Sequence, residues 1–340
     1  MGKLMLGVID ATTYKKEMND LTLQRSIAAV PFAGRYRLID FVLSNMVNSG
    51  IESVAIFPKY QYRSLMDHLG SGKNWDLNRK RDGLFFFPST DLPISHIGSF
   101  QHFQQHIDYF LRSTQKYALI CNSYTVCNID YEEVLRRHIM NECDITRICH
   151  HGQSLDMFIL ETSLLLDLIA NQQRNHYQSI VDVVNDQTNG LTVCDYEYDG
   201  YVAVIDSIER YFHHSLELLQ PDVWKQLFLK GRPIYTKVKD EPPTKYTSHA
   251  CVRNAMIANG CVIEGEIENS IISRSVKIGK EAVVKHSVIM QKSQIGENCH
   301  LEYVIVDKDA RIGDGVKLIG TPKEPIVIRK GTIQGALMKS

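Results

Sequence analysis

The short segment that ends at His151 carries side chains that often bind zinc. Cys143, Cys149, His150 and His151 offer two thiols and two imidazoles within one stretch of chain, and these groups are the common ligands of structural zinc. Zinc sites pair their ligands at characteristic short spacings, which the Cys-x5-Cys-His-His order does not match. We therefore expect these four residues to bind no metal.

The eight cysteines are scattered along the chain and form no Cys-x-x-Cys pair. This usage is typical of reduced, buried thiols in a cytoplasmic protein. Cys121 and Cys127 lie in or beside a short apolar run, so we expect them to pack in a sheet rather than to react.

A glycine-rich loop directly after a strand is a common cradle for nucleotide phosphates. Here the first apolar run, Leu4 to Ile9, continues as DATTYKKEMNDLTLQRSIAA, and no glycine occurs between Gly7 and Gly34. A side chain at every position keeps the backbone from closing around a triphosphate. The sequence therefore predicts that no phosphate-binding loop follows the first strand.

The elements that position these residues alternate between two kinds up to about residue 237. Short apolar runs predict buried strands, and stretches with apolar residues on one face predict helices. The expected strands are Leu4–Ile9, Ser53–Phe57 and Tyr117–Cys121, and the expected helices are Arg37–Asn48, Gln61–Leu69 and Tyr131–Asn141. This alternation predicts an α/β, Rossmann-like domain with a mostly parallel sheet covered by helices on both faces.

Length and composition predict two domains and exclude several classes. The chain has 340 residues, with 38 Lys+Arg against 39 Asp+Glu, so no global positive field favours nucleic acid or an anionic membrane as a partner. The longest apolar stretch, Met157 to Ala170, contains Glu161 and Asp167 and is too short to span a bilayer. No signal peptide is recognisable at the start. We expect a cytoplasmic protein that binds neither nucleic acid nor membrane.

The pattern changes near residue 240. Residues 239–248, KDEPPTKYTS, combine charges, two prolines and polar side chains, which is typical of a linker. The expected division is therefore an α/β domain over 1–238, a linker over 239–248 and a second domain over 249–340.

The second domain repeats itself. Ile278-Gly279, Ile295-Gly296 and Ile312-Gly313 are spaced 17 residues apart, and steps of five or six residues from Cys261 to Ile312 land on an apolar residue every time. An inward residue at about every sixth position predicts a parallel β-helix of hexapeptide repeats. An antiparallel sheet with regular turns is the alternative, but its inward residues would alternate at every second position.

His286 and His300 lie on this expected solenoid, where hexapeptide-repeat acyltransferases place a catalytic histidine. An acyl-CoA enzyme is therefore a further alternative, which the large α/β domain disfavours.

Three segments carry a family resemblance. AVPFAGRYRLIDFVLSNMVNSGIESVAIF, starting at Ala29, GSGKNWDLNRKRDG (Gly70 to Gly83) and NGCVIEGEIENSIISRSVKIGKEAVVKHSVIM (Asn259 to Met290) resemble blocks of the ADP-glucose pyrophosphorylases. These enzymes join ATP and glucose 1-phosphate to give ADP-glucose and pyrophosphate in glycogen or starch synthesis. The resemblance implies a nucleotidyltransferase domain, a left-handed β-helix and a tetrameric assembly.

The chain departs from this family where the family does its chemistry. By alignment with the family's motifs, Ile27 replaces a phosphate-contacting lysine, Tyr124 and Val204 replace two metal-binding aspartates, and Phe100 enters the nucleotide segment. The sugar-binding segment that follows Thr146 in the family is also missing. Negative charge that develops on transferring phosphates has to be stabilised. We therefore expect no catalytic residue, no metal and no cofactor.

The resemblance is accordingly closest to the non-catalytic, GlgD-type subunits of this family. It implies a regulatory pseudoenzyme that modulates a catalytic ADP-glucose pyrophosphorylase subunit allosterically within a heterotetramer, in glycogen biosynthesis. The alternative is an active glucose-1-phosphate adenylyltransferase with relocated metal carboxylates, for which Asp130 and Asp206 are the nearest candidates in the sequence.

Some ligand binding is still expected. Arg25, Arg35, Arg37 and His68 match family positions that face anionic effectors at the domain junction, and guanidinium groups suit phosphate recognition. The resemblance therefore implies a sugar-phosphate or adenylate effector at these residues. Arginines that are merely solvated or ion-paired are the alternative.

Overall fold

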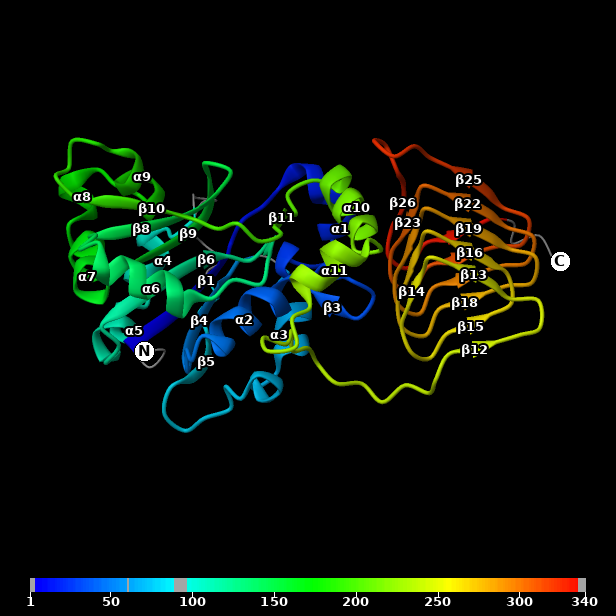
Figure 1. The fold of residues 1–340 in the computed structure, drawn as a ribbon, viewed down its shortest axis with the longest axis horizontal. Coiled ribbons are helices and arrows are strands. Elements are labelled where there is room, and N and C mark those ends of the chain that lie inside the picture. The colour runs from blue at the N-terminus through cyan, green and yellow to red at the C-terminus, as the bar shows by residue number, and fades with distance from the viewer. Residues whose placement is uncertain (1–3, 60, 89–96, 336–340) are drawn as a thin grey trace.

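The computed structural model describes residues 4–59, 61–88 and 97–335. A helix-covered sheet and a β-helix lie at opposite ends of an elongated molecule, with α10, α11 and α1 between them (Figure 1). The sheet domain comes first in the chain and the β-helix second, in the predicted order.

The first domain is built on a seven-stranded sheet. Its strands are, in spatial order, β10 (Val193–Glu197), β8 (Ile145–His150), β9 (Gln153–Glu161), β6 (Tyr117–Asn122), β1 (Met5–Ala11), β4 (Ser53–Pro58) and β5 (Gly83–Phe86). Only β9 runs antiparallel to its neighbours; the other pairs are parallel. The predicted mostly parallel sheet is confirmed.

Helices cover both faces of this sheet. One face packs against α2 (Leu38–Asn48) and α6 (Tyr131–Met140). The other face packs against α4 (Phe100–Gln105), α5 (Ile107–Arg112), α7 (Thr162–Ala170) and α9 (Ile180–Asn185). The side chains of β1 alternate between the two apolar clusters, with Val8 in one and Ile9 in the other, as a strand buried on both faces requires.

The smaller helices lie at the edges of this domain. They are α3 (Arg63–Leu69), the 3-10 turn η4 (Lys73–Trp75), α8 (Gln172–Asn175) and, near the β-helix, α10 (Ile208–Glu217) and α11 (Pro221–Leu227). The apolar stretch from Met157 to Ala170 is the end of β9 followed by α7. Nowhere in the described ranges does a helix have the length and apolar character needed to cross a membrane.

The expectation that all cysteines are reduced thiols was wrong for one pair. Cys143 and Cys194 form a disulfide, with their Cα atoms 6.0 Å apart. They are separated by 51 residues along the chain but meet because β10 pairs with β8, which places Cys194 opposite Thr146. Cys121 and Cys127 are buried in the sheet domain, as expected, whereas Cys251 is exposed.

The second domain is a left-handed β-helix with three parallel sheets. The first contains β12 (Lys245–Tyr246), β15 (Val262–Ile263), β18 (Lys277–Ile278), β21 (Gln294–Ile295), β24 (Arg311–Ile312) and β27 (Ile333–Gln334). The second contains β13 (Cys251–Arg253), β16 (Glu266–Glu268), β19 (Val283–Lys285), β22 (His300–Glu302) and β25 (Lys317–Ile319). The third contains β14 (Met256–Ile257), β17 (Ile271–Ile272), β20 (Val288–Ile289), β23 (Val304–Val306) and β26 (Ile326–Ile328).

The predicted inward positions of the β-helix are confirmed. The residues reached by the five- and six-residue steps, from Cys261 through Val284 to Ile312, are all at most 3% exposed. Strands of successive coils pair in parallel register, so the alternative of an antiparallel sheet is excluded. Within the segment 239–248, Lys245 and Tyr246 form β12 and already pair with β15.

Helix α10 joins the two domains. The Tyr211 hydroxyl donates a hydrogen bond to the Pro31 carbonyl oxygen (2.9 Å), and the Phe212 ring contacts that of Tyr303 in the β-helix. Met290 and Ile305 of the β-helix belong to the same apolar cluster as the sheet domain. One face of the β-helix therefore shares an apolar cluster with the sheet domain, whereas the interior of the β-helix forms a separate cluster.

Candidate functional site

The segment that follows β1 is helical instead of a glycine loop. It forms η2 (Lys16–Met18), α1 (Asn19–Thr22) and η3 (Ile27–Ala29), and it encloses a cavity of about 250 Å³ against the end of β1. The Asp10 carboxylate at that end accepts hydrogen bonds from the Thr12 hydroxyl (2.6 Å) and the Gly98 amide (2.8 Å). The segment after β1 therefore consists of short helical turns and has no glycine-rich loop.

Ile27 lies where the family's phosphate-contacting lysine is expected, and it is 2% exposed. It packs in the apolar cluster between the sheet and the β-helix, so the position has changed from a charged contact to a core contact.

Tyr124 and Val204, which replace the two metal-binding aspartates of the family, lie side by side. β7 (Thr125–Val126) pairs with β11 (Ala203–Val204), so that Val204 faces Thr125, and the Ile205 amide donates to the Tyr124 carbonyl oxygen (3.0 Å). The structure therefore brings together the two positions that the alignment assigned to one metal site.

The Tyr124 ring fills this position. Its hydroxyl donates to Asp156 (3.3 Å), and the Lys15 ammonium lies 5.1 Å from the ring centroid. Burial raises the pKa of Tyr124, and the nearby Asp156, Asp206 and Asp10 carboxylates raise it further. The side chain therefore stays a neutral phenol, which cannot replace a carboxylate as a metal ligand.

The nearby carboxylates do not compensate. Asp130 caps α6 and pairs with Arg232 (3.3 Å), and Asp206 pairs with Arg210 (3.0 Å). Among the described residues, the group of three His, Cys, Asp or Glu ligand atoms close enough to hold a metal lies elsewhere, on α10. The residues around Tyr124 therefore do not fit the divalent cation that the family's reaction needs.

The nucleotide segment is occupied by protein. Phe100 is fully buried and His102 is 1% exposed, and the Phe100 amide donates to the Gln178 carbonyl oxygen (2.9 Å). Neither ring nitrogen of His102 has a hydrogen-bond partner in the described part of the chain, and burial lowers its pKa. Both side chains are therefore buried inside the sheet domain.

The strands that flank the missing sugar-binding segment are directly connected. β8 ends at His150 and β9 begins at Gln153, with His151 and Gly152 in left-handed conformations at the turn. The zinc candidates of this region have other partners: Cys143 is in the disulfide, and His150 hydrogen-bonds the Tyr198 carbonyl oxygen.

At the domain junction, Arg25 connects the two domains. Its Nη2 donates to both carboxylate oxygens of Asp307 in the β-helix, at 2.6 and 2.8 Å, and both side chains are almost fully buried. Arg25 is therefore ion-paired, as the alternative to effector binding predicts for these arginines. It is buried and not on the surface. The exposed pair of Asp20 with Arg329 (2.6 Å) makes a second bridge from the same segment.

Arg37 and His68 are positioned by one carboxylate. Asp40, in the first turn of α2, accepts a hydrogen bond from the Arg37 amide (3.0 Å) and pairs with His68 Nε2 (2.6 Å). The Arg37 guanidinium also donates to the Ser64 carbonyl oxygen (2.6 Å). Burial lowers the pKa of Arg37 to about 10 and that of His68 below its ordinary value. Arg35 is exposed, with its guanidinium over the Tyr36 ring.

The β-helix adds cations that the sequence analysis missed. Burial, together with repulsion from Arg37, Arg25 and Lys330, lowers the pKa of Lys308 to about 8. Burial likewise lowers the pKa of Arg274, which is also repelled by Arg35. We call the cations gathered on the two sides of this junction the junction cluster: Arg35, Arg37, Arg274, Lys308 and Lys330.

A sequence signal for these residues existed. Arg274, Gln291 and Lys308 follow the 17-residue period of the solenoid, and backbone hydrogen bonds link their coils in order, from the Lys292 amide to Arg274 and from the Asp309 amide to Gln291. The same corner of successive coils therefore faces the sheet domain. The 17-residue repeat predicts the inward residues of the β-helix, and the cationic residues at one corner of its coils follow the same period.

Known proteins resemble the chain in both domains. A model of the nucleotidyl transferase family matches residues 15–155, and one described as GlmU-like, C-terminal hexapeptide matches residues 242–325. The glycogen biosynthesis protein GlgD of Geobacillus stearothermophilus is 68% identical over 99% of both chains, and that of Bacillus subtilis is 59% identical over 99% of this chain and 98% of its own. A glucose-1-phosphate adenylyltransferase of Geobacillus stearothermophilus is 26% identical over 84% of each chain.

Proposed function

Because this chain belongs to the GlgD family of glycogen biosynthesis proteins, we propose that it is a non-catalytic regulatory subunit of ADP-glucose pyrophosphorylase. In this role it assembles with a catalytic subunit, which makes ADP-glucose from ATP and glucose 1-phosphate, and it changes the activity of that subunit.

The observation that carries the proposal is the pair of substituted metal positions. Tyr124 and Val204 are neighbours in space, so both aspartates of one site are replaced together. The carboxylates around them are bonded to other groups. A chain with this pair cannot hold the cation that neutralises the transferring phosphates.

The magnitude of the loss favours an inactive chain. One charge-stabilising contact contributes about 3–4 kcal/mol to a transition state, or roughly a hundredfold to a thousandfold in rate. Here two carboxylates, one lysine, the glycine loop and the sugar segment are missing. Even though such effects are strongly non-additive, the combined loss predicts no useful turnover.

The junction cluster supports the regulatory half of the proposal. Arg37, Lys308 and Arg274 are cations whose pKa is lowered first by burial and then by repulsion from other cations at the junction. A sugar phosphate or adenylate would supply the missing negative charge, with guanidinium groups donating to phosphate oxygens. Arg25, which pairs with Asp307, would then hold the two sides of the site together.

The position of this cluster offers a route to the partner. An anion bound between α2 and the β-helix contacts both domains, so it would favour one relative orientation of the domains over others. A ligand changes a conformational equilibrium only through such differential contacts. A catalytic subunit docked on this chain would sense that orientation.

A partner of the required kind exists beside a close relative. Geobacillus stearothermophilus has both a GlgD protein and a glucose-1-phosphate adenylyltransferase. We therefore propose that the partner of this chain is the glucose-1-phosphate adenylyltransferase of its own organism, and that the two form a heterotetramer.

The test uses the full chain alone and together with that adenylyltransferase. Pyrophosphate release from ATP and glucose 1-phosphate is measured for each, and sedimentation velocity reports assembly. We expect no turnover by the chain alone, a mixed tetramer, and altered kinetics of the catalytic subunit. Turnover by the lone chain would support the alternative of relocated carboxylates, and unchanged partner kinetics and sedimentation would refute the regulatory role.

A further inference from the structure

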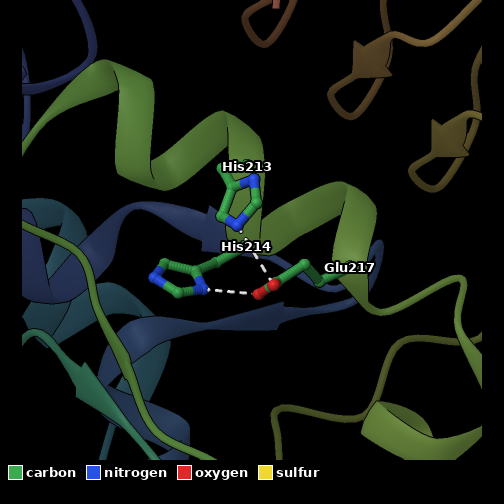
Figure 2. Close-up of side chains that lie close together, drawn as sticks. All are labelled: His213, His214 and Glu217. Atoms are coloured by element: carbon green, nitrogen blue, oxygen red, sulfur yellow. Dashed lines mark hydrogen bonds and ion pairs between the residues drawn. The ribbon is translucent and has the colours of Figure 1, made fainter. Parts of the chain in front are cut away.

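The last turn of α10 brings together two imidazoles and one carboxylate. His213 Nε2 lies 3.1 Å from one oxygen of Glu217, and His214 Nδ1 lies 2.7 Å from the other. In Figure 2 the His213 ring lies above the Glu217 carboxylate and the His214 ring lies to its left, with a dashed line from each ring to the carboxylate. The ligand atoms of all three residues lie within 4.8 Å of one another.

A fourth side chain, Tyr201, hydrogen-bonds to this cluster. The Tyr201 hydroxyl, from the segment just before β11, donates to Glu217 (3.0 Å) and lies 3.2 Å from His214 Nδ1. This hydrogen bond orients the Glu217 carboxylate. A second hydrogen bond to a ligating carboxylate is the usual support of a protein metal site.

The spacing and the place in the helix both favour a cation. Residues three and four apart lie on the same face of a helix, so Glu217 reaches both His213 (i, i+4) and His214 (i, i+3). The C-terminal end of a helix carries a partial negative charge that favours cations. Glu217 adds a full negative charge at this end, which a bound cation would offset.

We propose that His213, His214 and Glu217 form a zinc-binding site on the helix that joins the two domains. Two imidazoles, one carboxylate and one water are an established donor set for Zn²⁺. The His213 side chain is 64% exposed, so the ion can enter from solvent and water can complete the coordination. The site is separate from the substituted catalytic positions and from the junction cluster, and it does not depend on the regulatory role.

The site has a structural consequence. Tyr211 and Phe212, on the same helix, pack against Pro31 and the β-helix. An ion that fixes the last turn of α10 would stabilise this packing. Because the ion binds the folded chain, the midpoint of thermal unfolding should rise with free Zn²⁺.

The test uses the untagged full chain and Zn²⁺ alone, followed by isothermal titration calorimetry and by thermal unfolding. Removing one ligand in H213A should weaken binding at this site by at least about tenfold and abolish the thermal shift. H300A is the matched control, because the His300 side chain is 38% exposed and lies beside Glu302 (3.8 Å), and within the described residues it belongs to no group of three ligand atoms.

His213 is exposed and makes no core contact, so H213A should fold normally. E217Q, which keeps the side-chain size, provides a second variant, and Co²⁺ absorption spectra of the wild type provide a second readout. The proposal holds if H213A and E217Q both lose the strongest site while H300A keeps it. It is wrong if the three variants bind Zn²⁺ as the wild type does, or if the wild type shows no thermal shift.

Discussion

The catalytic cleft and the domain junction of this molecule have changed in opposite directions. In the cleft, a lysine and two aspartates of the family are replaced by Ile27, Tyr124 and Val204. These three side chains pack in an apolar cluster. At the junction, Arg37 and Lys308 remain charged although burial lowers the pKa of both. Buried charge is costly unless it is paired. Under the proposed function, the charge kept at the junction would bind an anionic effector, whereas the cleft would lack the charge that nucleotidyl transfer needs.

The largest effect should come from breaking the buried ion pair of the junction. In D307A the Arg25 guanidinium stays buried without its partner, so the free energy of unfolding should fall by about 3–5 kcal/mol. Urea denaturation measures this difference.

The exposed bridge between the same two segments is the matched control. R329A removes the partner of Asp20, and exposed ion pairs contribute at most about 1 kcal/mol. If both variants lose the same small amount of stability, the pair of Arg25 with Asp307 does not hold the two domains together.

The disulfide should matter for stability but not for either region. Replacing Cys143 in C143S removes the bond to Cys194, and the free energy of unfolding should fall by about 2–4 kcal/mol because the unfolded chain gains freedom. C251S, at an exposed free cysteine, should have no effect. Phosphate binding at the junction should be unchanged in C143S; a loss of binding would show that the sheet edge and the junction are coupled.

Removing one junction cation should weaken anion binding. In K308M the loss of one charge-assisted contact costs about 1.5–3 kcal/mol, or roughly tenfold to a hundredfold in affinity. Calorimetry with fructose 6-phosphate, AMP and inorganic phosphate measures the effect. K277M, at an exposed lysine of β18, is the control and should bind as the wild type does.

Anion binding at the junction cluster should depend on pH. The pKa of Lys308 is about 8, so its charge is present below that pH and lost above it. A bound anion favours the charged form, and affinity should therefore fall as pH rises through this value in the wild type. In K308M this fall should be absent. Equal pH profiles in the two proteins would exclude Lys308 from the site.

The smallest effect should come from restoring the metal carboxylates alone. The double variant Y124D/V204D returns two acidic residues to neighbouring positions, but the glycine loop, the lysine at position 27 and the sugar segment are still missing. We expect no pyrophosphate release. Measurable turnover in this variant would show that the two carboxylates alone restore activity. The difference between the cleft and the junction would then be smaller than described above.

The sequence predicted what depends on local pattern. Periodicity located β1, α2, β4 and β6 within a few residues, and the 17-residue repeat located the inward residues of the β-helix. The family motifs placed Tyr124 and Val204 at two metal-binding positions, and the pairing of β7 with β11 brings these two residues together in the fold.

Contacts between distant parts of the chain could not be predicted in the same way. Cys143 meets Cys194 only because β10 adds beside β8, and Arg25 meets Asp307 only because the two domains dock. Neither contact leaves a local signal. The cluster on α10 does have a local sequence signal, because His213, His214 and Glu217 have helical spacing. The zinc candidates named from the sequence were instead the residues from Cys143 to His151.

The most direct test compares the chain alone with the chain bound to its catalytic partner. Pyrophosphate release from ATP and glucose 1-phosphate with Mg²⁺ should be absent for the isolated chain, whereas adding it to the adenylyltransferase should change the partner's rate and its response to fructose 6-phosphate or AMP. Magnesium-dependent turnover by the isolated chain would contradict the account.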